Sequence, residues 1–200
     1  RDWSSDVCSP DLVMNSAVKW LGPDFSTGQV MFYRSFFALP PVIIAALLGG
    51  GLVMLKPNRF DVHAIRSFAG AASMFCGFSA LTMIPLADAV AIGFASPLFI
   101  VVLAVFMLGE KVHAYRWSAV AAGFVGVMIM IGPHFQAGHG SLIGAGFALA
   151  GALFTGFAMV SIRRMSANEH AITITFYFSL TCSIIGLLTW LGGWHTQTLL

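Results

Sequence analysis

Arg34 is the residue whose position most directly indicates chemistry, because it lies inside a long apolar run, 29–55. An arginine at the centre of a membrane helix costs about 2.5–3.5 kcal/mol on insertion scales, and such charges commonly mark functional sites. Arg34 lies about six residues, or roughly 9 Å, inside its predicted helix. Two interpretations stay open. The side chain either faces a polar cavity or network, or it extends outward to the membrane surface.

Four further residues could take part in binding, and each has a structural alternative. Lys19 lies near the same membrane face as Arg34, where it either pairs with an anionic group or anchors a helix end. Asn15 and Ser96 either line a cavity or form hydrogen bonds between helices. Pro97 has no backbone N–H, so it either marks a broken helix at a binding position or shapes helix packing.

A short internal repeat relates two distant parts of the chain. Residues 32–36 read Phe-Tyr-Arg-Ser-Phe, and residues 176–180 read Phe-Tyr-Phe-Ser-Leu. The copies fall in the predicted second and seventh helices, so they cross the membrane in opposite senses. Inverted repeats are a recurrent architecture of secondary transporters, in which the solute site forms between the copies. Tyr33 and Tyr177 occupy matching positions, where they either line a cavity as a pair or belong to the interfacial aromatic belt.

Composition predicts the fold class. The 200 residues are 58% hydrophobic and only 9% charged, with a mean hydropathy of +0.87, whereas a soluble domain carries about 25% charged residues. A membrane-crossing helix needs about 20 apolar residues. We therefore expect an all-α, polytopic transmembrane helix bundle. Its apolar segments are 13–21, 28–54, 65–86, 89–109, 116–133, 141–162 and 171–193, of which the first is too short to span.

One predicted helix carries small residues at four-residue spacing: Gly144, Ala148, Ala152 and Gly156. Residues at this spacing share one helix face, and small side chains let another helix approach closely. This stripe predicts helix packing and not chemistry.

The basic residues predict the orientation. Seven of the ten Lys and Arg residues fall in three alternate links, 55–66, 110–116 and 163–170, whereas the intervening links contain none. Because basic links remain in the cytoplasm, we place these three on the cytoplasmic side of a bacterial inner membrane.

Several function classes lack support in the sequence. No nucleophile with an accompanying base and no metal-ligand spacing occurs within a span, so we predict neither an enzyme nor a metal or cofactor site. The six histidines lie in predicted links or at helix ends, and we expect them to be solvated. No basic patch indicates nucleic acid. The expected partners are the lipid bilayer and a small-molecule substrate, and a homodimer stays open.

The first twelve residues differ from the rest, since they are polar and aperiodic. They are not a signal peptide, because they lack a basic start, an apolar core and a cleavage pattern. The string resembles the translation of sequencing-adapter DNA, and we expect 1–12 to be a non-native leader.

The remaining chain resembles the EamA-type transporters of the drug/metabolite transporter superfamily over about residues 13–193. The motifs that carry the resemblance follow in order along the chain: Met14-Asn15 to Val18-Lys19, Arg34, Ala80-Leu81 to Ile84-Pro85-Leu86-Ala87, Ser96-Pro97-Leu98-Phe99, Leu108-Gly109-Glu110-Lys111, Gly123 and Gly126-Val127.

This resemblance implies ten helices in two inverted five-helix repeats. It assigns 13–133 to the first repeat, with a truncated first helix, and 141–200 to the start of the second. It also implies transport of a small metabolite or drug-like solute by alternating access. The alternative is a membrane scaffold or partner subunit that transports nothing, which needs no charge at membrane depth.

Overall fold

The computed structural model describes residues 16, 19, 20, 25–49, 51, 55, 57, 60–109, 113–136, 139–165 and 170–189, without the side chains of 133–139. Within these ranges the chain is helical and contains no strand. Six stretches are long and apolar enough to cross a membrane. The predicted polytopic helix bundle is therefore confirmed. The leader 1–12 and Asn15 lie outside the described residues. The helices are α2 (Thr27–Gly49), α3 (Phe60–Met83), α4 (Leu86–Gly93), α5 (Ser96–Leu108), α6 (Ala114–Gln136), α7 (His139–Met165) and α8 (Ala171–Leu188).

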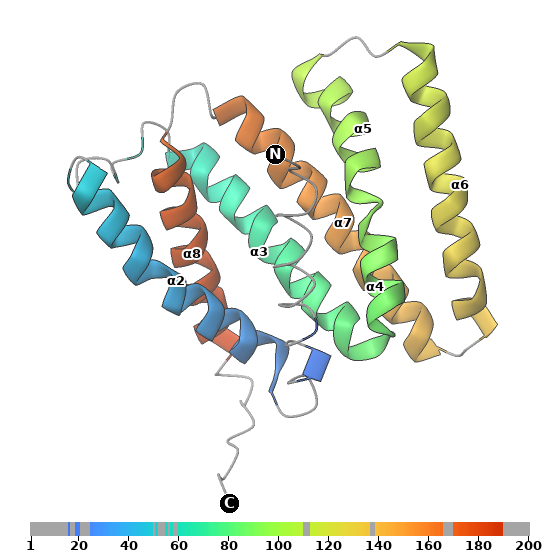
Figure 1. Cartoon of the computed structure of the whole chain (residues 1–200), viewed down its shortest axis with the longest axis horizontal. Coiled ribbons are helices and arrows are strands. Elements are labelled where there is room, and N and C mark those ends of the chain that lie inside the picture. The colour runs from blue at the N-terminus through green and yellow to red at the C-terminus, as the bar shows by residue number, and fades with distance from the viewer. Residues whose placement is uncertain are drawn as a thin grey trace, which may run out of the picture.

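The spans lie side by side in an order that differs from their order in the sequence (Figure 1). Helix α8 lies between α2 and α3, and α7 lies between α3 and the pair α4 and α5, with α6 at the edge. Consecutive spans alternate in direction. The C-terminal ends of α2, α5 and α7 therefore lie at the same end of the bundle as the N-terminal ends of α3, α6 and α8.

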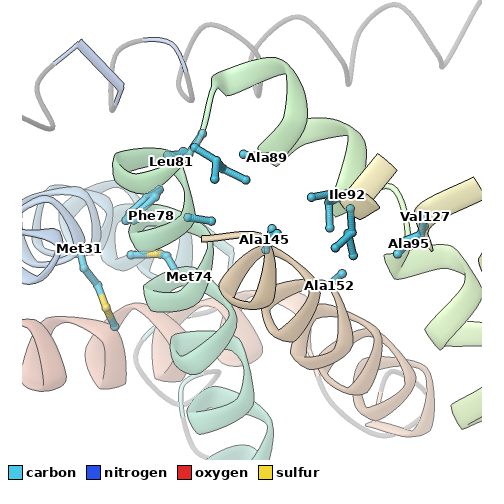
Figure 2. Close-up of a cluster of buried hydrophobic side chains, with 14 of the residues drawn as sticks. Met31, Met74, Phe78, Leu81, Ala89, Ile92, Ala95, Val127, Ala145 and Ala152 are labelled. Atoms are coloured by element: carbon cyan, nitrogen blue, oxygen red, sulfur yellow. The ribbon is translucent and has the colours of Figure 1, made fainter. Parts of the chain in front are cut away.

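The most extensive helix contact joins α3 and α7. The predicted small-residue stripe lies in the packed interior, since Ala148 and Ala152 are only 5% and 4% exposed. A Cβ added at Gly144 would lie 2.8 Å from Cβ of Met83, the last residue of α3, so the two helices touch closely there. Figure 2 shows Ala145 and Ala152 within the buried apolar cluster that also holds Ile92.

Helices α2 and α8 form the second extensive contact, and they run antiparallel. Gly28 at the start of α2 packs on Thr189 at the end of α8. One helical turn further into α2, the backbone of Phe32 lies within 3 Å of the position that a Cβ of Gly186 would take. The absence of a side chain at these glycines permits this close approach.

Some predicted link boundaries were wrong, because the helices extend past the apolar runs. Helix α3 begins at Phe60, so Arg66 lies on its second turn and not in a link. Arg116 lies in the first turn of α6, and Arg163 lies in the last turn of α7. Hydropathy marks where side chains become apolar, whereas helical hydrogen bonding continues into the polar boundary region.

The fourth span is interrupted. Helix α4 ends at Gly93 and α5 begins at Ser96, with a turn at 94 and 95. Pro97 cannot donate a hydrogen bond to the carbonyl oxygen of Gly93, which an unbroken helix would require. The backbone N–H of Ala95 donates instead to the carbonyl oxygen of Ile92, three residues back, at 2.9 Å. The helix therefore tightens and changes direction in the interior of the bundle.

Candidate functional site

The buried polar side chains of the described residues gather along one seam, where α2, α3 and α8 meet. Apart from Ser161, every buried polar side chain comes from these three helices. We call the central group of them the polar seam: Ser35 on α2, His63 and Ser67 on α3, and Thr173, Ser179 and Ser183 on α8. Polar groups in lipid-facing bundles cost free energy unless they are satisfied by partners. Their concentration on one seam distinguishes it from the contact of α3 with α7, which is mainly apolar but includes a hydrogen bond between Ser73 and Thr155.

Arg34 spans this seam from α2 to α3. Its Nη1 atom lies 3.1 Å from the sulfur of Met74, and its guanidinium carbon lies 5.9 Å from the ring centroid of Phe78. The residue as a whole is exposed. Arg34 thus points along the bundle toward other helices, at a depth where a charge is expensive.

Cys182 joins the three helices at the middle of the seam. Its side chain is fully buried, and it shares a hydrogen bond with the hydroxyl of Ser35. Arg34 directly precedes Ser35 on α2, and Arg66 stacks on Phe178, one helical turn before Cys182 on α8. The two basic side chains therefore lie near this position of α8, although they come from different helices.

Sequence reasoning missed Arg66, because it assigned this residue to a cytoplasmic link. The guanidinium carbon of Arg66 lies 4.7 Å from the ring centroid of Phe178, within the range of a cation–π contact. Phe178 in turn covers Gly70, where an added Cβ would lie 2.7 Å from its ring. One signal was available. Arg66 lies at the predicted start of the apolar segment 65–86, so an extension of the helix toward its N-terminus places this residue at depth.

His63 contradicts the expectation that the histidines are solvated. It is 1% exposed, and its ring centroid lies 5.2 Å from that of Tyr177. His63 lies one helical turn inside α3, and its helix face is turned toward α8. Tyr177 also packs against Phe60, with ring centroids 5.9 Å apart. Tyr177 therefore closes the seam at the N-terminal end of α3.

Tyr33 and Tyr177 do not meet. Tyr33 is 43% exposed and packs against the rings of Phe32 and Phe37 on its own helix. Because α2 and α8 are antiparallel, matching repeat positions lie at different heights. The contact between Phe32 and Gly186 places Tyr33 level with about residue 185 of α8, roughly 12 Å along the helix from Tyr177. The tyrosines line opposite ends of the helix pair.

Lys19 caps the C-terminal end of α3. Its Nζ atom donates hydrogen bonds to the carbonyl oxygens of Leu81 and Ile84, at 2.5 and 2.6 Å. These carbonyls belong to the C-terminal end of α3, where no further helical N–H reaches them and the helix dipole favours a cation. The contacts of Lys19 agree with the interpretation that it anchors a helix end. Its role in binding an anionic group stays a prediction.

Ser96 and Pro97 lie at the break between α4 and α5, away from the polar seam. Ser96 is half-buried and Pro97 is exposed. The break described above is one of the two alternatives that Pro97 left open, whereas a contact of either residue with solute stays a prediction. Beyond the break, Phe99 of α5 packs on Gly156 of α7.

A large pocket lies on a different face of α3. Its volume is about 710 Å³, and its lining comes from α3, α5, α7 and α8: Ala64, Ile65, Phe68, Ala69, Leu103, Leu153, Phe154, Phe157 and Thr181. None of the predicted site residues lines it. At about 100° per residue, Ile65 and Phe68 point away from the face of α3 that carries His63 and Ser67. Thr181 supplies the one polar side chain of this lining, so the pocket offers few groups that could bind a polar or charged solute.

Comparison with known proteins agrees with the resemblance seen in the motifs. The model of the EamA-like transporter family matches residues 13–132. The S-adenosylmethionine uptake transporter of Rickettsia prowazekii is 29% identical over 90% of this chain and 60% of its own length. The pseudopaline exporter of Pseudomonas aeruginosa is 28% identical, with coverage of 89% and 62%. The riboflavin transporter of Brucella anthropi is 27% identical, with coverage of 94% and 65%.

The chain spans about 60% of the length of the first of these relatives. No solved structure matches it. The relatives are named as transporters, which agrees with the prediction that this chain is not an enzyme. Because the family model matches residues 13–132, the chain belongs to the EamA-like transporter family.

Proposed function

We propose that this chain is part of a secondary transporter that moves a small metabolite or drug-like solute across a bacterial inner membrane by alternating access. The observation that carries the proposal is the polar seam, with Arg34 extending across it toward Met74 and Phe78 on α3. A scaffold gains nothing from an arginine at this depth, whereas a solute path needs polar groups there.

The helix arrangement supports alternating access. The antiparallel contact of α2 with α8 joins the two copies of the short repeat, as an inverted-repeat transporter requires. We propose that 13–133 and 141–200 belong to two such repeats of a ten-helix protein. Rocking of one repeat against the other would open the seam first to one side of the membrane and then to the other.

The proposed orientation places the basic ends of the helices in the cytoplasm. Arg116, Arg163 and Arg164 lie at the end of the bundle where α6 begins and α7 ends, and all three are exposed. The positive-inside rule favours this end for the cytoplasmic side. The homodimer that the sequence left open is tested separately, by the mass of the detergent-solubilised full-length parent protein.

The solutes named for the relatives supply the first probes. S-Adenosylmethionine, pseudopaline and riboflavin differ in charge and size, so each is tested as a radiolabelled or fluorescent solute in proteoliposomes of the full-length parent. For any solute taken up, we expect Arg34→Ala to lower uptake at least about tenfold, which corresponds to about 1.4 kcal/mol. Arg116→Ala, which removes an exposed arginine from the first turn of α6, is the matched control and should transport normally.

Accessibility labelling separates a transporter from a scaffold without a known solute. A single cysteine replaces Arg34 in a parent that lacks its native cysteines, and a membrane-impermeant thiol reagent is added from each side. Reaction at position 34 supports a water-filled path. A residue sealed from both sides, in a parent that takes up none of the probes, would favour the scaffold.

A further inference from the structure

Arg66 is a second basic residue at membrane depth, and its charge has incomplete hydrogen bonding. It is the seventh residue of α3, about 9 Å from the start of the helix. Its Nε and Nη1 atoms are buried and have no hydrogen-bond partner among the described residues. The stacking of the guanidinium on Phe178 satisfies none of its N–H donors. A buried charged donor without an acceptor is costly, so an acceptor is expected in some state of the protein.

The described helices offer no carboxylate at this depth. Their acidic residues are Asp61, in the first turn of α3, and Asp88, in the first turn of α4. Helices α2 and α8, which complete the seam, contain no acidic residue. A counter-ion for Arg66 within the seam must therefore come from outside these helices.

Arg34 and Arg66 approach one another from opposite ends of the bundle. Arg34 reaches α3 at Met74, eight residues or about 12 Å beyond Arg66 along the helix. The ring of Phe178, on which Arg66 stacks, also covers Gly70 of α3. Cys182 on α8 and Met74 on α3 each lie four residues, or about one helical turn, beyond this contact, and the two helices run in the same direction. A group that lies beside Cys182 in the middle of the seam is therefore near two positively charged side chains.

We propose that Arg66 and Arg34 together bind an oxyanion, the carboxylate or phosphate group of the transported solute, beside Cys182. The proposal rests on the proposed transport function and specifies its solute class. Guanidinium groups present a planar set of donors that fits a carboxylate or phosphate, and they retain their charge when desolvated. In the conformation described here the seam is closed, since Cys182 is fully buried, so the anion would enter when the repeats move apart.

The native Cys182 thiol is a probe of this position. In the full-length parent, every other cysteine is replaced by alanine, and Cys182 is treated with methanethiosulfonate reagents of similar size. One reagent carries a sulfonate and the other a trimethylammonium group. Each reaction rate is divided by the rate of the same reagent with a small thiol in solution. The ratio of the two corrected rates then reports the local preference for an anion.

We expect the sulfonate reagent to react with Cys182 at least about tenfold faster than the trimethylammonium reagent, because charged clefts concentrate ions of opposite sign. Arg66→Gln should lower this ratio at least about threefold, and Arg66→Lys should retain most of it. Arg34→Gln should lower the ratio as well, which keeps the test decisive if Arg66→Gln fails to fold. Arg116→Gln is the control and should leave the ratio unchanged.

Three results would overturn the proposal: equal corrected rates for the two reagents, a ratio that neither Arg66→Gln nor Arg34→Gln changes, or a Cys182 that reacts with neither reagent. Each is distinguishable from failure of the proposed function. A parent that takes up a probe and loses uptake in Arg34→Ala remains a transporter even if Cys182 shows no preference for anions.

Discussion

Gly156 tests the contact between α7 and α5 just beyond the broken helix. A Cβ added at Gly156 would lie 2.9 Å from Cβ of Phe99 and 3.2 Å from the backbone nitrogen of Ile100. Carbon atoms pack favourably at about 3.5–4.0 Å, so α5 would have to move by roughly 0.5–1 Å. Backbone cannot rotate away as a flexible side chain can, and we therefore expect Gly156→Ala to strain the interface.

The magnitude follows from two opposing terms. Overpacking costs about 1–3 kcal/mol, whereas replacement of glycine by alanine inside a helix gains up to about 1 kcal/mol. Gly146 lies on the same helix, is exposed, and has no atom within 4 Å of its added Cβ. Gly146→Ala therefore changes the free energy of unfolding through helix propensity alone. We expect Gly156→Ala to be less stable than Gly146→Ala by about 1–3 kcal/mol.

The assay is reversible unfolding of the full-length parent and both variants in mild detergent titrated with sodium dodecyl sulfate, followed by helical circular dichroism. Size-exclusion chromatography before the titration checks that each variant starts as a folded species. Equal free energies of unfolding for Gly156→Ala and Gly146→Ala would refute the reasoning, because they would show that α5 and α7 do not touch as closely as described.

Three further changes test other contacts by the same unfolding assay. Ala148→Leu adds bulk at a site that is 5% exposed and should cost about 1–3 kcal/mol; normal stability would mean that the stripe is not a packing seam. Ser73→Ala removes hydrogen bonds to Thr155 Oγ1 at 2.6 Å and to the Gly151 carbonyl oxygen at 3.1 Å, and should cost about 0.6–1.7 kcal/mol. Lys19→Met removes the cap of α3 and should cost about 0.3–1 kcal/mol; if it abolishes transport while stability is unchanged, Lys19 binds solute instead.

Much of the fold was predictable because the membrane constrains composition directly. An apolar segment of about 20 residues has few alternatives to a spanning helix, and the spans at 116–133 and 141–162 lie within α6 and α7 as observed. A break at Pro97 was one of two outcomes that the sequence left open, because proline removes a helical hydrogen bond. Proline alone does not decide it, since Pro40 and Pro41 lie inside the unbroken α2.

The site was less predictable, because helix neighbours depend on how the helices are rotated and ordered. Arg34 was recognisable from its depth alone, but its contacts with Met74 and Phe78 required the position of α3. Arg66 was hidden by a helix boundary that lies within the polar region. His63 was expected to be solvated because it lies near a helix end, and the packing of Tyr177 over it could not be inferred from α3 itself.

The sequence by itself determined that this is a multi-pass helical membrane protein with the motifs of its family. Those properties follow from the hydropathy of each segment and from short patterns along one helix. Only the tertiary structure decided that Lys19 caps α3 and that α8 separates α2 from α3. It also decided that Arg66 stacks on Phe178, one helical turn before Cys182, and that Arg34 contacts Met74 on α3. Hydropathy indicates the approximate depth of side chains within the apolar runs, whereas exact helix boundaries and the rotation and order of the helices, which bring charges together, arise from packing among all of them.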